Sequence, residues 1–159
     1  MTNKNKLYEQ KITAARAALE KLLVGLTAEQ WQTVVISEGQ SWTVQDIVAH
    51  LLENEQAMSI HVYKIRSGRE TVPEGFDLER WNAGLQERAP TVTPQELLQS
   101  LAEARGKTLE LLATIKEEEW SLEGRHPLRQ QISIEQYYET IAGHDTWHTK
   151  DIRQGLGLR

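Results

Sequence analysis

The sequence of 159 residues predicts an all-α fold, a four-helix bundle that forms one domain over residues 1–159. Apolar residues recur at intervals of three and four along four long segments, which is typical of helices that bury one face. Residues that cap helices stand at the beginnings of these segments. Alternating strand-like runs and Asn-Gly or Asp-Gly hairpin signals are missing. We therefore expect long helices and no strands.

The first helix is expected from about Lys4 to Val24, where apolar residues four and three positions apart share one face. Gly25 ends this helix. A short segment with capping-box spacing then begins at Thr27. It carries Trp31, an apolar residue suited to close one end of the bundle.

The second long helix is expected to begin near Thr43 and to end at Ser67-Gly68. The stretch from Arg69 to Pro90 is less regular, and we expect one short helix in it, from Leu78 to Arg88. This connection is long enough to cross the length of the bundle. It therefore allows a topology other than a simple up-down-up-down order.

The third long helix has a clear start, with Thr93 as the N-cap, Pro94 at the first helical position and Glu96 at the third. A loop from Lys116 to Ile132 follows. The last long helix is expected from Ser133 to Gly155.

The composition limits the chemistry and the partners. The formal net charge is -5, and the chain has five histidines and no cysteine. An acidic balance without a basic stripe argues against nucleic acid as a partner. No apolar run approaches the roughly 18 residues that a membrane helix needs, and the polar start is unlike a signal peptide. We expect a cytoplasmic protein in which any metal ion is held by histidine and carboxylate.

The strongest chemical signal is the pair His144 and His148, which lie about 40° apart on a helical wheel and inside the apolar arc. Histidines four positions apart on a helix can chelate one metal ion. His50, at the edge of the apolar stripe of its own helix, can point toward them. Together these three histidines predict an open site for a divalent metal. The alternative is a purely structural bundle in which hydrogen bonds satisfy the imidazoles.

Two carboxylates are candidate catalytic residues. Glu55 falls within the apolar arc of the second long helix, where it can orient an imidazole or act as a general base. The alternative is that Glu55 reaches the rim of the bundle. Asp145 flanks the two histidines of the last helix, where it can bond to an imidazole or pair with a basic neighbour.

Other polar residues are candidate substrate contacts. Asn54 and His61 share the side of the second helix that carries His50, and Tyr137 lies two turns before the last histidine pair. The alternatives are a polar rim for the first two residues and core packing for the tyrosine. His126, beside a proline, is expected to be a solvated loop residue.

The run from Ser41 to Leu51, the pair Trp81-Asn82 and the closing histidines His144 and His148 resemble the DinB-like (YfiT-like) superfamily, and the resemblance spans nearly the whole chain. It implies a bundle with up-down-down-up topology, in agreement with the long connection. It also implies a divalent metal, such as zinc or nickel, held by His50 and the two closing histidines. By the same resemblance, Asn82 is a substrate contact near the mouth of the site.

Characterised relatives in this superfamily include bacillithiol-dependent S-transferases, mycothiol-dependent maleylpyruvate isomerases, hydrolases and self-resistance proteins. We therefore expect a metal-dependent enzyme that transfers a thiol to small electrophiles, in detoxification or a stress response. A metal would lower the pKa of the thiol, and this low-molecular-weight thiol must come from outside because the chain has no cysteine. A metal-dependent hydrolase and a noncatalytic protein that sequesters a reactive ligand stay open. The expected partners are a small-molecule substrate and, as is common in such proteins, a second copy in a homodimer, with no nucleic acid and no membrane.

Overall fold

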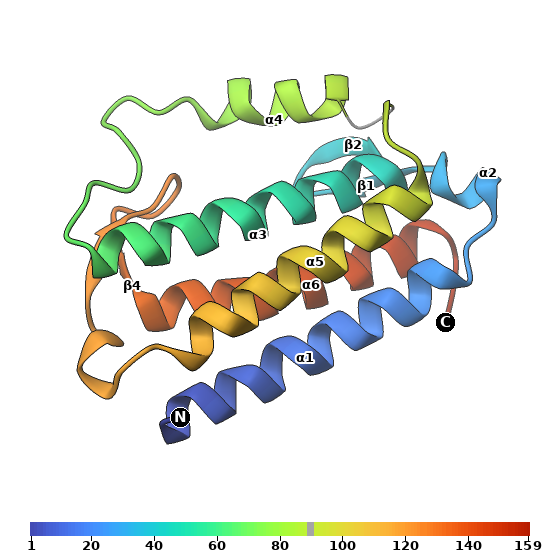
Figure 1. Cartoon of the computed structure of the whole chain (residues 1–159). Helices are drawn as coiled ribbons and strands as arrows, with labels where there is room; N and C mark the ends of the chain where they lie inside the picture. Colours follow the sequence, from blue (N-terminus) through green and yellow to red (C-terminus); the bar gives the residue numbers. More distant parts are fainter. Residues whose placement is uncertain (89–90) are drawn as a thin grey trace.

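The computed structural model describes residues 1–88 and 91–159, without the side chains of residues 85 and 86. The protein is a bundle of four long helices, as predicted (Figure 1). These helices are α1 (Asn3–Val24), α3 (Val44–Arg66), α5 (Pro94–Ala113) and α6 (Ile134–Gly155). The shorter helices are α2 (Ala28–Trp31), α4 (Leu78–Arg88) and the 3-10 turn η2 (Glu117–Glu119). The expected helix boundaries hold closely, while Pro90, at the end of the irregular stretch, lies outside the described residues.

Three of the long helices begin at capping boxes. Thr43, Thr93 and Ser133 each accept a hydrogen bond from the backbone N–H three residues further on, and the side chain at that position accepts one from the cap's own N–H. These bonds satisfy N–H groups that the start of a helix would otherwise leave unpaired. Pro94 follows its cap at a position that needs no N–H. Local sequence therefore determines where these helices start.

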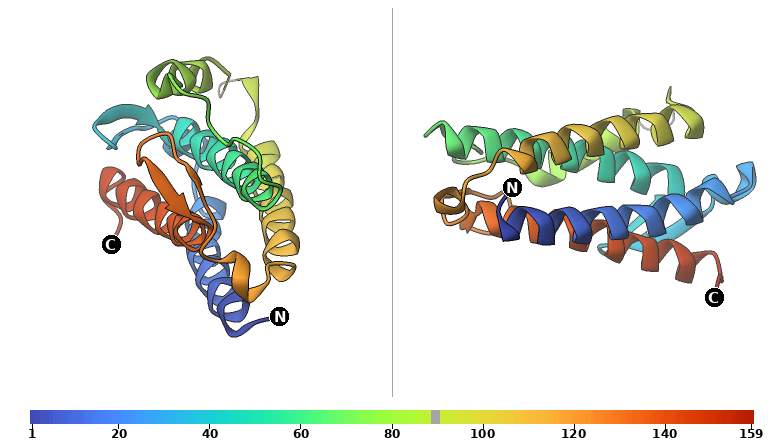
Figure 2. Two further views of the ribbon diagram at one scale, coloured as in Figure 1. Left: turned by 90° about the vertical axis from the view of Figure 1, so that its left-hand side faces the viewer. Right: turned by 60° about the horizontal axis from the view of Figure 1, so that its bottom comes forward.

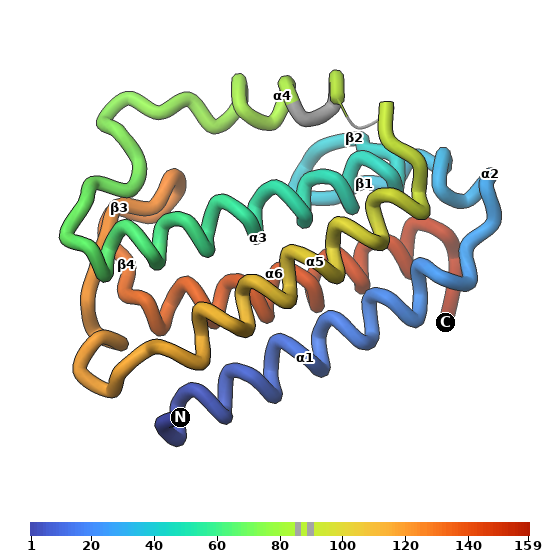
Figure 3. Tube along the Cα trace, viewed as in Figure 1, coloured from blue at the N-terminus to red at the C-terminus, as the bar shows by residue number. Residues whose placement is uncertain are grey.

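The helices α1 and α6 run parallel, and α3 and α5 run together in the opposite direction (Figure 1). Lys4 meets Glu135 near the start of both α1 and α6, and Arg16 meets Asp145 further along both, as parallel helices require. The order along the chain is therefore up-down-down-up. The long connection from α3 to α5 makes this order possible, and it carries α4 along the outer side of α3 (Figures 2 and 3).

The expectation of no strands does not hold, because two short antiparallel hairpins precede α3 and α6. Their strands are β1 (Val34–Ser37), β2 (Gln40–Thr43), β3 (Glu123–Arg125) and β4 (Gln131–Ser133). In β1, Val35 and Ser37 are buried while Val34 and Ile36 are exposed. The apolar residues on the exposed side hide the period-two pattern that identifies a half-buried strand. Their β-branched side chains were the remaining signal.

The turn of the first hairpin consists of Glu38 and Gly39, both with positive φ, 51° and 72°. Two successive residues of this kind form a tight turn whose twist matches a hairpin. Asn or Asp usually stands at the first of these positions. A non-glycine residue such as Glu38 costs about 1–2 kcal/mol in this conformation. The hairpin packs closely against α6 at Gly155. A Cβ at this glycine would lie only 2.2 Å from Cγ1 of Val35.

The apolar core has two parts, one toward each end of the bundle. The part near the β1–β2 hairpin includes Leu19, Trp42, Val48, Leu101 and Ile152. The part at the opposite end includes Ile12, Met58, Leu112, Trp120 and Tyr138. Each of the four long helices contributes to both parts. Between the two parts, each long helix carries one buried residue with a full charge.

This charged layer consists of Arg16, Glu55, Arg105 and Asp145, one from each long helix. Arg16 Nε lies 3.0 Å from Asp145 Oδ2, and Arg105 joins Glu55 at 2.7 Å and Asp145 at 2.9 Å. Arg16 also pairs with Glu55. None of the four is more than 5% exposed. Because the two positive and two negative charges cancel, the layer can lie inside the bundle.

The helices of the bundle are amphipathic rather than apolar throughout. Over residues 1–88 and 91–159, no helix combines the length and the apolar content needed to cross a membrane. This finding does not test the expected cytoplasmic location, which stays a prediction.

Candidate metal centre

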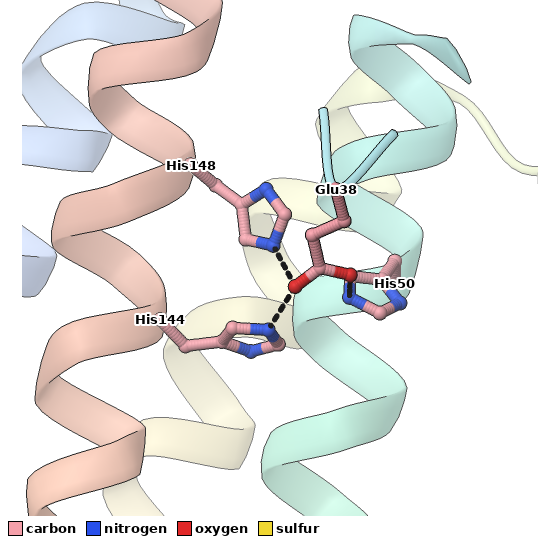
Figure 4. Close-up of side chains that lie close together, drawn as sticks. All are labelled: Glu38, His50, His144 and His148. Carbon is pink, nitrogen blue, oxygen red and sulfur yellow. Dashed lines mark hydrogen bonds and ion pairs between the residues drawn. The ribbon is translucent and has the colours of Figure 1, made fainter. Parts of the chain in front are cut away.

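Three histidines and one glutamate converge between α3, α6 and the turn of the first hairpin (Figure 4). His50 comes from α3, while His144 and His148 come from successive turns of α6. Glu38 reaches between the two helices from the β1–β2 turn. One ligand atom from each residue lies within 4.8 Å of the others. The structure thus brings together the three histidines expected from the sequence and adds a carboxylate to them.

The spacing of these atoms suits ligands that share an ion. The Nε2 atoms of His50, His144 and His148 lie 3.4, 3.1 and 3.4 Å from oxygens of Glu38. Direct charge-assisted hydrogen bonds are usually shorter, about 2.7–2.9 Å. Four ligands placed 2.1 Å from a tetrahedral ion would be about 3.4 Å from one another. The Nε2 atoms of His50 and His148 are also buried without a hydrogen-bond partner.

The electrostatics favour the protonation states that bind a metal. The nearby imidazoles of His144, His148 and His50 hold the pKa of Glu38 well below its usual value. Burial lowers the pKa of His50, and the neighbouring Glu38 carboxylate opposes this only in part. An ionised carboxylate and a neutral imidazole are the forms that coordinate a divalent cation. The donor set of three nitrogens and one oxygen therefore fits such an ion.

The proton on His148 is placed by a short chain of hydrogen bonds. Ser37 Oγ donates to Asp151 Oδ2 at 2.6 Å and lies 2.8 Å from Nδ1 of His148. Because the hydroxyl has a single proton and gives it to the carboxylate, it must accept the Nδ1 proton of His148. The Nε2 lone pair of His148 then faces Glu38. This is the tautomer that a metal ligand requires.

Asn54 and Trp42 orient His50. The Asn54 amide nitrogen lies 3.0 Å from Nδ1 of His50 and donates to the backbone oxygen of the same residue at 2.8 Å. The Trp42 ring packs on the imidazole, with 4.8 Å between ring centroids. Because an amide nitrogen only donates, Nδ1 accepts here and the proton of His50 lies on Nε2, facing Glu38. Coordination through Nε2 therefore requires this proton to move to Nδ1 and the Asn54 amide to turn its oxygen toward it.

A cavity of about 550 Å³ opens from the metal centre, a size within the usual range for small-molecule sites. Its walls come from α3, the connection after it, α4, the β3–β4 turn and α6. Most of the lining is apolar or aromatic. It includes Met58, Phe76 and Trp81, and the rings of Phe76 and Trp81 lie 6.1 Å apart. Glu38, His50 and His144 line the same space.

Glu55 and Asp145, the two expected catalytic residues, do not join this centre. Their carboxylates bond to Arg16 and Arg105 in the charged layer, and neither residue lines the cavity. Asp145 directly follows His144, but it faces the bundle interior because neighbouring residues of a helix point about 100° apart. For Glu55 the helical wheel had indicated the apolar arc, with the rim of the bundle as the alternative, and the side chain is buried. Pairing with a basic neighbour was one of the two alternatives for Asp145, and Arg16 and Arg105 are those neighbours.

The expected substrate contacts lie around the cavity. Asn54, His61 and Asn82 line it, and the Oδ1 atom of Asn82 is buried without a hydrogen-bond partner. Tyr137 is buried behind the wall, where its hydroxyl lies 3.3 Å from Nδ1 of His61. His126 was expected to be a solvated loop residue, but it is half-buried and also lines the cavity. The β3–β4 hairpin folds this loop residue back against α6.

Glu38, Ser37 and Asp151 are functional candidates that the sequence did not single out. Glu38 and Ser37 belong to a hairpin that was not expected, so no pattern placed them near the histidines. Asp151 follows His148 by three positions, and that helical neighbourhood was the available signal for it. The contact of the turn with α6 is tertiary and leaves no periodic trace in the sequence.

Comparison with known proteins agrees with this architecture. The family model described as the DinB superfamily matches residues 11–152. A solved structure of YfiT from Bacillus subtilis, described as a probable metal-dependent hydrolase with an unusual four-helix bundle topology, is 20% identical. It has a TM-score of 0.79, and the match covers 100% of this chain and 91% of that one. No curated protein matches the chain.

Two further solved structures share the fold. A mycothiol-dependent maleylpyruvate isomerase is 19% identical with a TM-score of 0.75, and the match covers 96% of this chain but 63% of that one. The colibactin self-resistance protein ClbS, in complex with double-stranded DNA, is 14% identical with a TM-score of 0.77, covering 98% of this chain and 96% of that one. The ClbS complex corrects the exclusion of nucleic acid drawn from the acidic composition. Net charge describes the whole chain and does not exclude a local contact with a phosphate backbone.

Proposed function

The chain belongs to the DinB superfamily, and we propose that it is a divalent-metal-dependent enzyme that acts on small electrophiles. The observation that carries this proposal is the convergence of three imidazoles and one carboxylate at the end of a largely apolar cavity. His50, His144 and His148 are the proposed metal ligands, with Glu38 as a fourth. A divalent cation held there would lower the pKa of a thiol or water molecule that binds beside it.

The first candidate reaction is the transfer of an external thiol. The likeness to a mycothiol-dependent isomerase supports this reading. Because the chain has no cysteine, the thiol must come from outside. A sulfur–carbon bond forms while the sulfur–hydrogen bond of the thiol and the bond from carbon to its leaving group break. The thiol proton departs with the leaving group. In this reaction the apolar lining would hold the electrophile, and Asn54 and Asn82 would orient its polar atoms.

The second candidate reaction is hydrolysis, which the likeness to YfiT supports. The same residues would orient water in place of the thiol, and the cavity would hold an ester or amide. The two reactions differ in the nucleophile and in the bond broken. They share the metal centre, so a test of the centre comes first.

The metal content of protein purified without a histidine tag tests the proposal. We expect about one equivalent of a divalent metal in the native protein and little in His50→Ala or His148→Ala, as measured by elemental analysis. The matched control is His61→Ala, a histidine of the same cavity that does not belong to the metal centre. Metal content unchanged in both ligand variants would overturn the assignment of the centre.

Turnover distinguishes the two reactions. Loss of free thiol is followed with bacillithiol, mycothiol or glutathione and a generic electrophile such as chlorodinitrobenzene. We expect consumption of at least one thiol, and its loss in His148→Ala. Hydrolysis of an activated ester without turnover of any thiol would instead establish the hydrolase. Metal binding without either reaction would leave a protein that sequesters its ligand.

A further inference from the structure

A second group of histidines lies in the cavity, apart from the metal centre. His61 on α3 and His126 in the β3–β4 turn both line the cavity. Each packs against Tyr137, with ring centroids 5.7 Å and 5.8 Å from that of the tyrosine. The metal centre does not use these imidazoles, and the proposed function assigns them no role.

Backbone contacts determine the proton position on His126. The backbone N–H groups of Leu128 and Arg129 donate to its Nδ1 atom, at 3.1 and 3.2 Å. Because Nδ1 accepts both bonds, the proton of the neutral ring lies on Nε2. Burial, followed by the charge of Arg129, lowers the pKa of His126 to about 4, so the ring is neutral at pH 7. His126 is therefore a hydrogen-bond donor through Nε2.

The hydrogen bonds of Tyr137 make His61 an acceptor through Nε2, whereas His126 is a donor. The Tyr137 hydroxyl lies 3.2 Å from the carbonyl oxygen of Arg125 and 3.3 Å from Nδ1 of His61. A carbonyl only accepts, so the single tyrosine proton goes to Arg125 and His61 donates its Nδ1 proton to the hydroxyl. Burial raises the pKa of Tyr137 to about 12 and lowers that of His61 to about 4. Neutral His61 is therefore an acceptor through Nε2.

We propose that His61 and His126 form a donor–acceptor pair that recognises a neutral amide group on the ligand of this cavity. The N–H of the amide would donate to Nε2 of His61, and its carbonyl would accept from Nε2 of His126. Phe76 and Trp81 in the same cavity suit an aromatic or apolar body attached to that amide. The inference rests on the proposed function only in taking this cavity as the substrate site.

Three probes of similar shape test the pair in metal-free protein. Benzamide offers both a donor and an acceptor, acetophenone offers only an acceptor, and benzoate is a charged acceptor. We expect benzamide to bind about tenfold more tightly than acetophenone, because the missing donor leaves Nε2 of His61 unpaired. Binding is followed through the ring nitrogens of ¹⁵N-histidine-labelled protein, whose chemical shifts also report the tautomers. Tighter binding of benzoate, or an Nε2-protonated His61, would overturn the proposal.

Variants separate this subsite from the metal centre. In His61→Phe we expect the preference for benzamide over acetophenone to disappear, with metal content unchanged. In His126→Phe both probes should weaken together, because both lose the same donor. The matched control is His144→Ala, which should lose metal and keep the preference for benzamide. If His61→Phe still binds benzamide more tightly than acetophenone, another residue recognises the amide N–H and the proposal is wrong. This conclusion holds whether or not the protein binds a metal.

Discussion

Single protons decide whether the imidazoles of the metal centre can coordinate. Ser37 receives the Nδ1 proton of His148 because its own proton goes to Asp151. His50 has its Nδ1 atom occupied by the Asn54 amide in this arrangement. Partners of this kind determine both the tautomer and the ring orientation of metal-binding histidines. Substitutions of Ser37 and Asn54, the hydrogen-bond partners of the ligands, can therefore test the metal centre as well as substitutions of the ligands themselves.

Ser37→Ala removes the acceptor for the Nδ1 proton of His148. We expect metal affinity to fall by about 10–100-fold, the usual effect of losing such a partner. Competition with a chelating dye measures this change. Ser41→Ala, an exposed serine of the same hairpin, is the matched control and should bind metal like the native protein. Equal affinities in the two variants would mean that the bond to Ser37 does not orient His148.

Glu38→Gln keeps the size of the side chain and removes its charge. We expect metal affinity to fall by at least about tenfold, since the loss of a ligand should cost no less than the loss of a ligand's partner. In cobalt-loaded protein, the visible absorption of a four-coordinate ion should weaken as well. Glu29→Gln, an exposed glutamate of α2, is the matched control. If affinity and absorption both stay unchanged, Glu38 is not a ligand.

At the scale of elements, the first hairpin delivers Glu38 to two helices that it does not belong to. The turn holds Glu38 in a left-handed conformation, and Gly155 lets β1 approach α6 closely. The hairpin therefore adds to the bundle a ligand that the helices alone do not provide.

Gly39→Ala tests this role of the hairpin. A Cβ at Gly39 would meet nothing within 4 Å, so the cost comes from the φ of +72° alone, about 1–2 kcal/mol. We expect a matching loss of stability in urea unfolding together with weaker metal binding. The control is Gly157→Ala, with a φ of +67° and equally open surroundings beyond the end of α6. It should lose similar stability and keep its metal affinity, and weaker metal binding in this control would contradict the proposed role.

The helices themselves were largely predictable. Thr43, Thr93 and Ser133 determine their starts through bonds to residues three positions away, and the apolar periodicity gives their buried faces. Both signals are local, so one sequence contains them in full. The strand β1 was missed because Val34 and Ile36 are apolar and exposed, which removes the alternation from it.

At the scale of the whole molecule, the charged layer joins all four long helices. Burial alone would raise the pKa of Glu55, but the hydrogen bond and charge of Arg105, together with Arg16, hold it below its usual 4.5. A depressed pKa in the folded state stabilises the fold above the pKa of the unfolded chain. We therefore expect this contribution to be complete above about pH 4.5 and to be lost as the pH falls further.

Glu55→Gln leaves two buried arginines with one carboxylate. We expect the free energy of unfolding at pH 7 to fall by about 3–5 kcal/mol, as measured with urea. The difference between native protein and variant should shrink as the pH is lowered below 4.5. Glu118→Gln, an exposed glutamate, is the control and should follow the native protein at every pH. A difference that does not depend on pH would mean that the charge of Glu55 is not what stabilises the bundle.

The sequence by itself determined the helices, their caps and their inward faces, because these depend on neighbours within a few positions. It also indicated that His50, His144 and His148 share the interior. Only the tertiary structure decided which inward groups meet. It placed Glu55 and Asp145 on arginines and brought Glu38 from a hairpin turn onto the histidines. Contacts between residues far apart in the chain depend on how elements pack in three dimensions, which periodicity along one element does not record.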